Sequence, residues 1–154
     1  MSLRIRLING PNLGRLGLRE PERYGRETLD TIVARLNIQA ATLGCELSHF
    51  QSDIEGELVR YLNTSGDQAD GLILNPAAYT HTSVALRDAV LCSGLPCVEV
   101  HLTNVYQRET FRHVSLTAPV CIGQITGFGA LGYALALQAL VEHLKVQGSG
   151  FGIQ

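Results

Sequence analysis

The chain has 154 residues, of which 45% are hydrophobic and 17% charged, and its formal net charge is −2 at pH 7. This length suits one domain with one core, and the small negative charge argues against a surface that binds nucleic acid. No apolar run approaches the ~20 residues that span a bilayer, and the N-terminal apolar run is too short for a signal peptide. We therefore expect a cytoplasmic protein without a membrane partner, and the low charged fraction mildly favours an oligomer.

Strand-like and helix-like patterns alternate along the chain. In order, they predict a strand at 3–8, a helix over 29–43, a strand at 45–51, a helix near 54–62, a strand at 71–74, a helix over 82–93, strands at 97–102 and 120–126, and a helix over 129–146. Gly44 stops the first helix, and Ser52 with Glu55 predicts a capping box for the second. We expect one catalytic domain over residues 1–154, with a flexible tail from about residue 147.

The apolar spacing also predicts which side chains face the core and which cysteines are buried. The first helix shows one apolar face, formed by Leu29, Ile32, Val33, Leu36, Ala40 and Leu43, and the second shows another, formed by Ile54, Leu58, Tyr61 and Leu62. Four cysteines lie in or beside apolar segments: Cys45, Cys92, Cys97 and Cys121. Buried free thiols are the expected state, because the spacing lacks the C-x-x-C pairs of a zinc site.

Alternation of strands with helices implies right-handed βαβ units and a parallel sheet covered on both faces. Five strands in this length predict an α/β, flavodoxin-like, doubly wound fold. Ligands of such folds bind outside the carboxyl ends of the strands. Polar residues collect after three of the predicted strands: Asn9 and Asn12, then Asn75 and His81, then His101, Thr103, Arg108 and Arg112.

Three familiar uses of this fold are disfavoured by the residues at the strand ends. The stretch from Gly127 to Gly132 matches G-x-G-x-x-G, but no further strand or acidic residue follows as a dinucleotide site requires. A phosphoryl-accepting receiver would need carboxylates where Asn9 and Asn75 stand. A flavin phosphate loop would need hydroxyl groups that residues 9–17 lack.

Glu99 and His101 lie two residues apart, so they share one face of a strand. His101 alone could be a core histidine, but a neighbouring carboxylate makes an imidazole a better general acid. Thr103 continues the same face. We expect His81 to open the third helix, where free N–H groups favour an anion, and Arg112 to reach the same mouth. Together these residues predict a pocket for a small carboxylate that carries hydroxyl groups.

Residues 8–25 are rich in glycine, proline and arginine, and they contain Tyr24. A tyrosine that acts as a base must lower its pKa from about 10 to about 7, which requires roughly 4 kcal/mol. Several guanidinium groups in a partly dry site could supply that stabilisation, and the candidates are Arg15, Arg19, Arg23, Arg108 and Arg112. Equally, Tyr24 could pack its ring beneath the loop while the arginines stay in water. The length of the segment favours a mobile lid.

Three segments resemble the signature segments of type II 3-dehydroquinate dehydratase: INGPNLGRLGLREPERYG at 8–25, LNPAAYTHTSVALRDAV at 74–90, and VEVHLTNVYQRETFRHVS at 98–115. Their order, spacing and the total length also match, so the resemblance covers nearly the whole chain. It implies trans-dehydration of 3-dehydroquinate to 3-dehydroshikimate through an enolate, with no metal, no other cofactor and no Schiff-base lysine. The single lysine, Lys145, agrees with the last point.

The resemblance implies a catalytic role for each of five matching residues. Tyr24 would be the base that takes a proton from C2, and Arg19 would favour the ionised tyrosine. His101 would protonate the departing C1 hydroxyl, with Glu99 behind it. Asn12 would help to stabilise the enolate through a water molecule.

Further matches imply the contacts to the substrate. Asn75 and the backbone of Leu102 and Thr103 would hold the carboxylate and the ring, and His81 and Arg112 would contact the hydroxyl groups.

The resemblance also implies an assembly. Asp88 matches a residue contributed across a subunit interface, which implies a homododecamer built of trimers. Arg108, one of the cations expected near Tyr24, is a supporting residue of the site and is not among these matches. The chain departs from the common family pattern at Gly14, Arg15 and Thr103, and none of these changes removes a proposed catalytic group.

Two alternatives to a cofactor-free lyase remain at this stage. A flavodoxin-like ligand-binding module without catalysis would be supported by a bound, coloured flavin. A structural homo-oligomer that has lost activity is disfavoured, because Tyr24, Arg19 and His101 are all present. Aromatic biosynthesis and quinate breakdown use the same dehydration step, and the resemblance fits either role.

Overall fold

A computed structural model describes residues 2–18, 20–24 and 26–148, and only the backbone of Arg23 and Tyr24. Its five strands form one parallel sheet in the order β2-β1-β3-β4-β5. The bounds are Leu3–Asn9 for β1, Cys45–Gln51 for β2, Gly71–Asn75 for β3, Cys97–His101 for β4 and Gly123–Thr126 for β5. The order reverses direction at β1, so the prediction of a doubly wound α/β sheet is confirmed.

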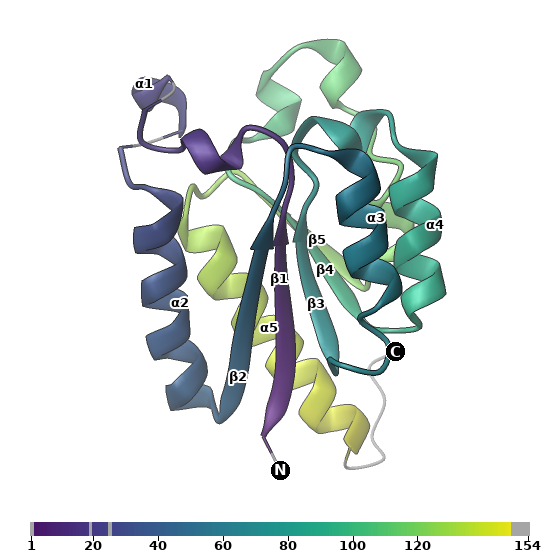
Figure 1. The fold of residues 1–154 in the computed structure, drawn as a ribbon. Helices are drawn as coiled ribbons and strands as arrows, with labels where there is room; N and C mark the ends of the chain where they lie inside the picture. Colours follow the sequence, from purple (N-terminus) through teal and green to yellow (C-terminus); the bar gives the residue numbers. More distant parts are fainter. Residues whose placement is uncertain (1, 19, 25, 149–154) are drawn as a thin grey trace.

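Helices cover both faces of the sheet (Figure 1). On one face, α2 (Leu29–Leu43) and α5 (Leu131–Gly148) pack over a core that includes Leu7 and Ile73. On the other face, α3 (Glu55–Asn63) and α4 (Val84–Ser93) pack over a second core. None of the described helices combines the length and apolar character needed to cross a bilayer.

Helix α2 forms where the sequence pattern places it. Thr28 is the N-cap, since its hydroxyl accepts a hydrogen bond from the Thr31 amide at 3.2 Å. Gly44 is the C-cap with a φ of 77°, a left-handed conformation that glycine adopts without steric cost. Four of the six predicted face residues are buried and the other two, Val33 and Leu43, are partly buried against the same core.

The predicted capping box at Ser52 is wrong. The Ser52 amide donates to the carbonyl of Asn9, which extends the pairing of β1 with β2 and delays the helix. Its hydroxyl accepts from the Ile54 amide at 2.9 Å and contacts the Glu57 carboxylate, not that of Glu55. Helix α3 therefore begins at Glu55, and Ile54, predicted to face the core, is 60% exposed.

The prediction that His81 opens a helix is also wrong. A 3₁₀ helix, η2 (Ala77–His81), precedes α4 and ends at His81. Helix α4 begins at Val84, and the Ser83 hydroxyl caps it by accepting from the Leu86 amide at 2.9 Å. The Ser83 hydroxyl thus occupies the N-terminus of α4, which therefore offers no anion site at His81.

Other differences concern the last third of the chain and one thiol. The fifth strand is shorter than predicted, because a 3₁₀ helix, η5 (Ala118–Val120), occupies the start of that segment. All four cysteines are free; Cys45 and Cys97 are buried and Cys121 is half-buried. Cys92 lies exposed on α4, so the prediction of a buried thiol is wrong there.

The carboxyl ends of β1 and β3 approach each other closely. The Gly10 amide donates to the Asn75 carbonyl at 2.8 Å, and a Cβ atom on Gly10 would lie 2.6 Å from the Pro76 carbonyl oxygen. Asn12 and Ala77 follow with positive φ angles of 70° and 52°. These two non-glycine residues in the left-handed region mark a constrained turn at the strand ends, where functional sites commonly store strain.

We expect Gly10→Ala to lower the free energy of unfolding by about 1–3 kcal/mol, because the backbone atoms it meets cannot yield as a flexible side chain would. Gly56→Ala is the matched control. Its Cβ meets nothing within 4 Å on α3, so it should gain about 0.5–1 kcal/mol from helix propensity. Urea unfolding of both variants checks this, and equal stabilities would contradict the close approach.

Candidate active site

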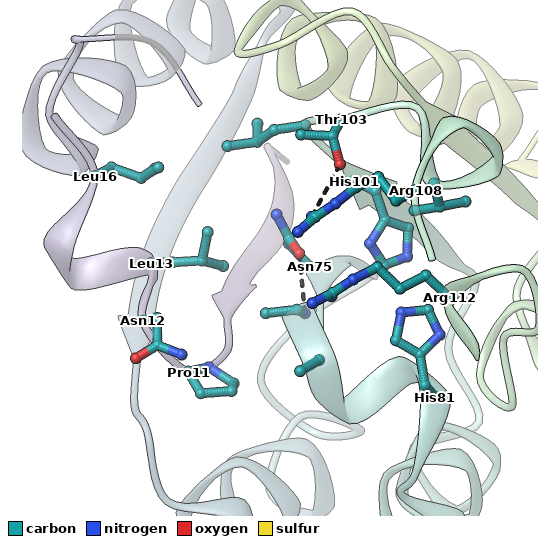
Figure 2. Close-up of a pocket in the computed structure, with 14 residues that line it drawn as sticks. Pro11, Asn12, Leu13, Leu16, Asn75, His81, His101, Thr103, Arg108 and Arg112 are labelled. Atoms are coloured by element: carbon teal, nitrogen blue, oxygen red, sulfur yellow. Dashed lines mark hydrogen bonds between the residues drawn. The ribbon is translucent and has the colours of Figure 1, made fainter. Parts of the chain in front are cut away.

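A pocket opens at the carboxyl end of the sheet, between the segment after β1 and the segments after β3 and β4 (Figure 2). Asn12 and Leu13 lie on one side of it, and His81, His101 and Arg112 lie on the other. The pocket brings together eight of the predicted site residues: Asn12, Asn75, His81, His101, Leu102, Thr103, Arg108 and Arg112.

Of the other four predicted residues, two lie elsewhere in the described structure and two fall on parts that it does not describe. Glu99 lies behind His101 and is fully buried. Asp88 is exposed on α4 and does not line the pocket. Arg19 lies outside the described residues. Tyr24 ends the short helix α1 (Pro21–Tyr24), but its side chain also lies outside the described part of the chain.

The pair of Glu99 and His101 forms as the strand pattern predicts. Glu99 Oε2 lies 2.9 Å from His101 Nε2, with the carboxylate fully buried and the imidazole 8% exposed. Burial alone would raise the pKa of Glu99, but hydrogen bonds from His101, Thr117 and Gln124 outweigh it and lower that pKa. An ionised Glu99 can only accept, so Nε2 of His101 carries a hydrogen and Nδ1 is left for the pocket.

Sequence reasoning missed the other groups that bind Glu99. Hydroxyls of Thr80, Ser115 and Thr117 and the amide of Gln124 all lie within hydrogen-bond distance of its carboxylate. No sequence signal identified them, and even Gln124 is set beside Glu99 only by the register in which β4 pairs with β5. That register follows from the packed sheet and is absent from the one-dimensional pattern.

His81 presents a neutral imidazole to the pocket. Its Nδ1 donates to the Val114 carbonyl at 2.8 Å, which leaves Nε2 as the other ring nitrogen. Burial lowers its pKa, and the nearby charges of His101 and Arg112 act in the same direction against the opposing Val114 contact. Because Nδ1 carries the hydrogen of the neutral ring, Nε2 can only accept, which suits a hydrogen bond donated by a hydroxyl group.

Two arginines give the pocket its positive charge. Arg112 Nε donates to Glu109 at 2.5 Å, and its guanidinium lies 5.1 Å from the centre of the Phe111 ring. Arg108 Nη1 lies 3.5 Å from Thr103 Oγ1 (Figure 2). Both are lining residues, so the pocket favours an anionic ligand.

Two asparagines at the strand ends are held by Tyr133, a fully buried residue of α5 that sequence reasoning missed. The Tyr133 hydroxyl donates to Asn9 Oδ1 at 2.5 Å and accepts from Asn75 Nδ2 at 2.9 Å. Asn75 Oδ1 in turn accepts from the Ala77 amide at 3.0 Å (Figure 2). Burial raises the pKa of Tyr133, so its hydroxyl stays protonated and fixes Asn75 in the pocket wall.

The first half of the predicted lid is anchored. Leu13 and Leu16 line the pocket and are buried in the core that α2 and α5 cover, and the Asn12 amide donates to Asp53 Oδ1 at 2.8 Å. Arg15 is exposed on the short helix η1 (Leu13–Arg15). Motion of the remainder of the segment stays a prediction.

The comparison with known families assigns the chain to a class of enzyme. Among the described residues, no three His, Cys, Asp or Glu side chains are grouped to hold a metal ion. Residues 3–141 match the model of the family described as dehydroquinase class II.

The chain belongs to the class II dehydroquinase family. A 3-dehydroquinate dehydratase from Jannaschia sp. is 52% identical over 143 residues, which cover 93% of this chain and 97% of that protein. A Bacillus cereus protein of the same name is 51% identical over 142 residues, covering 92% and 97%.

Solved structures of class II dehydroquinases agree with this assignment. The type II dehydroquinase of Butyrivibrio crossotus has a TM-score of 0.88 and 42% identity, covering 90% of this chain and 97% of that one. The type II dehydroquinase of Propionibacterium acnes has a TM-score of 0.89 and 41% identity, covering 92% and 98%. The resemblance seen in the sequence is confirmed, and a flavodoxin-like module without catalysis is not favoured.

We expect Tyr133→Phe to lower the free energy of unfolding by about 1–3 kcal/mol, because Asn9 and Asn75 each lose a buried partner. The control is Tyr61→Phe, which keeps the ring stacked on Phe50 and should change stability by less than about 0.5 kcal/mol. Urea unfolding measures both. A Tyr133→Phe protein as stable as the control would show that the hydroxyl does not organise the two asparagines.

Proposed function

We propose that this protein dehydrates 3-dehydroquinate to 3-dehydroshikimate, the dehydration step of the shikimate pathway. The observation that carries the proposal is the family match over residues 3–141, together with relatives that bear the name of this enzyme. The pocket supports the proposal independently. The buried, hydrogen-bonded pair of Glu99 and His101 and polar side chains from the ends of three strands meet at this pocket.

The chemistry of the pocket suits a ring that carries a carboxylate and hydroxyl groups. Arg108 and Arg112 supply positive charge, while Asn75 and the backbone of Leu102 and Thr103 supply fixed polar groups. In our proposal, Asn75, Leu102 and Thr103 hold the carboxylate and the ring. His81 and Arg112 contact the hydroxyl groups, and Arg108 supports the site.

The proposed reaction proceeds in two proton transfers. Tyr24, with Arg19 favouring its ionised form, takes the proton from C2 and leaves an enolate at the C3 carbonyl. Asn12 helps to stabilise that enolate through a water molecule. His101, held by Glu99, then protonates the C1 hydroxyl, the C1–O bond breaks, and water departs as the C1–C2 double bond forms.

The direct test is an absorbance assay with purified, chelator-treated protein and 3-dehydroquinate. We expect the absorbance of a conjugated enone to rise as 3-dehydroshikimate accumulates. A flat trace from folded protein that binds 3-dehydroquinate would overturn the catalytic assignment. A flat trace without binding would also overturn the substrate assignment.

We expect Tyr24→Phe to lower kcat by at least about a hundredfold with little change in substrate affinity, because it removes only the proposed base. Tyr106→Phe is the matched control, since Tyr106 is 60% exposed and does not line the pocket. Steady-state kinetics and a binding titration measure both effects. A Tyr24→Phe enzyme with the turnover of the control would show that the base is another group.

We propose that the active form is a homododecamer built of trimers and that Asp88 completes the site of a neighbouring subunit. The exposed position of Asp88 on α4, away from its own chain's pocket, is consistent with that role. A cytoplasmic location is part of the same proposal, as expected for an enzyme whose thiols are free.

Subunit mixing tests the role of Asp88. Tyr24→Phe and Asp88→Ala should each be nearly inactive alone, whereas co-assembled oligomers of the two should regain activity. Activity returns because some sites combine an intact Tyr24 with a neighbour's intact Asp88. If the mixture is no more active than its separate components, Asp88 acts only within its own subunit. Sedimentation would report whether twelve chains assemble.

A further inference from the structure

The buried carboxylate of Glu99 accepts hydrogen bonds from groups on four separate segments. Oε2 lies 2.9 Å from His101 Nε2, 2.9 Å from Ser115 Oγ and 2.7 Å from Gln124 Nε2. Oε1 lies 3.1 Å from Thr80 Oγ1 and also accepts from the Thr117 hydroxyl. The two oxygens therefore differ, and Oε2 is the one shared by the histidine and the glutamine.

The three hydroxyl groups do not by themselves fix the charge of Glu99. A hydroxyl donates one hydrogen and accepts others, so it can serve either a carboxylate or a carboxylic acid. The direction of hydrogen bonding to Glu99 is clearest for Ser115. Its Oγ already accepts from the amides of Ala118 at 2.9 Å and Thr117 at 3.3 Å, so its hydrogen is left to donate. Thr80 and Thr117 also lie 2.8 Å from each other, so their hydrogens have alternative acceptors.

Gln124 is different, because an amide nitrogen only donates. Its Nε2 faces Oε2, and the reverse orientation would set an amide oxygen against a carboxylate oxygen. Protonation of Oε2 would therefore weaken this hydrogen bond, because a hydroxyl oxygen is a poorer acceptor than a carboxylate oxygen. Glu99 pairs with Gln124 in the register of β4 with β5, so the contact is set by the sheet itself.

Gln124 lines a cavity beside the substrate pocket, and the two share His81, His101 and Arg112. It is not among the described residues that line the substrate pocket, whereas His101 is. Its nearest route to the reaction is through Oε2 of Glu99 to Nε2 of His101.

We propose that Gln124 is a positioning residue that holds Glu99 ionised with Oε2 directed at His101, so that Nε2 keeps its hydrogen and Nδ1 delivers the proton to the departing hydroxyl. This inference rests on the proposed dehydration. Without the amide, Oε2 becomes a stronger base, and the hydrogen shared with His101 moves toward Glu99. The imidazole is then a weaker proton donor to the departing hydroxyl, although substrate binding is unaffected.

The test compares Gln124→Met with Gln39→Met. Both glutamines are half-buried, and Gln39 Nε2 makes one hydrogen bond, to the Ala134 carbonyl at 2.9 Å. We expect Gln124→Met to lower kcat by about tenfold with KM within about twofold of the wild type, a loss typical of one hydrogen bond to a charged group. Gln39→Met should keep the wild-type kcat.

A spectroscopic signature separates positioning from stability. In protein labelled with ¹⁵N-histidine, the His101 ring signals are assigned by their loss in His101→Asn. We expect the wild type and Gln39→Met to show the same protonated Nε2 signal, and Gln124→Met to shift it toward the unprotonated value. Gln124→Glu keeps the side-chain size and places a second carboxylate against Oε2, so one proton is shared between them and kcat should fall at least as far.

Three outcomes would overturn the inference: an unchanged kcat in Gln124→Met or Gln124→Glu, a rise of KM that accounts for the loss, or a His101 signal that matches the control. A wild type without dehydratase activity would instead overturn the proposed function. The ¹⁵N signals would still decide whether Gln124 sets the state of His101.

Discussion

The burial of one ionised carboxylate organises the site. Glu99 has no exposed surface, and a charge in such a position is tolerated only when donors surround it. Those donors come from η2, from residues 115–117, from β4 itself and from β5. The hydrogen bonds to this one carboxylate therefore hold three other segments against the end of β4. They also hold His101 in the wall of the pocket.

The opposite wall depends on a second buried polar contact. Tyr133 reaches from α5 to the ends of β1 and β3, where Asn9 and Asn75 would otherwise leave amide groups unpaired inside the protein. The close approach of Gly10 to Pro76 constrains the same junction of β1 and β3. The doubly wound topology thus supplies a rigid rim, to which the arginine-rich segment after β1 attaches through Leu13 and Leu16.

This arrangement divides the work of the proposed reaction. The acid, His101, stands on a strand end and is oriented by buried groups. The proposed base, Tyr24, belongs to the segment between β1 and α2, whose helix α1 lies above α2, to one side of the strand ends (Figure 1). A rigid acid and a base on a long loop suit an elimination in which the substrate must enter before the second group closes on it.

The sequence by itself determined the sheet, its doubly wound order and the family, because strand and helix periods alternate and three long motifs stand in register. It also placed Glu99 beside His101, since residues two apart share a strand face. Only the tertiary structure decided the start of α3, the 3₁₀ helix that ends at His81, and the contacts of Tyr133 and Gln124. The contacts of Gln124 with Glu99 and of Tyr133 with Asn9 join residues 25 and 124 positions apart in the chain, and local patterns carry no information about such contacts.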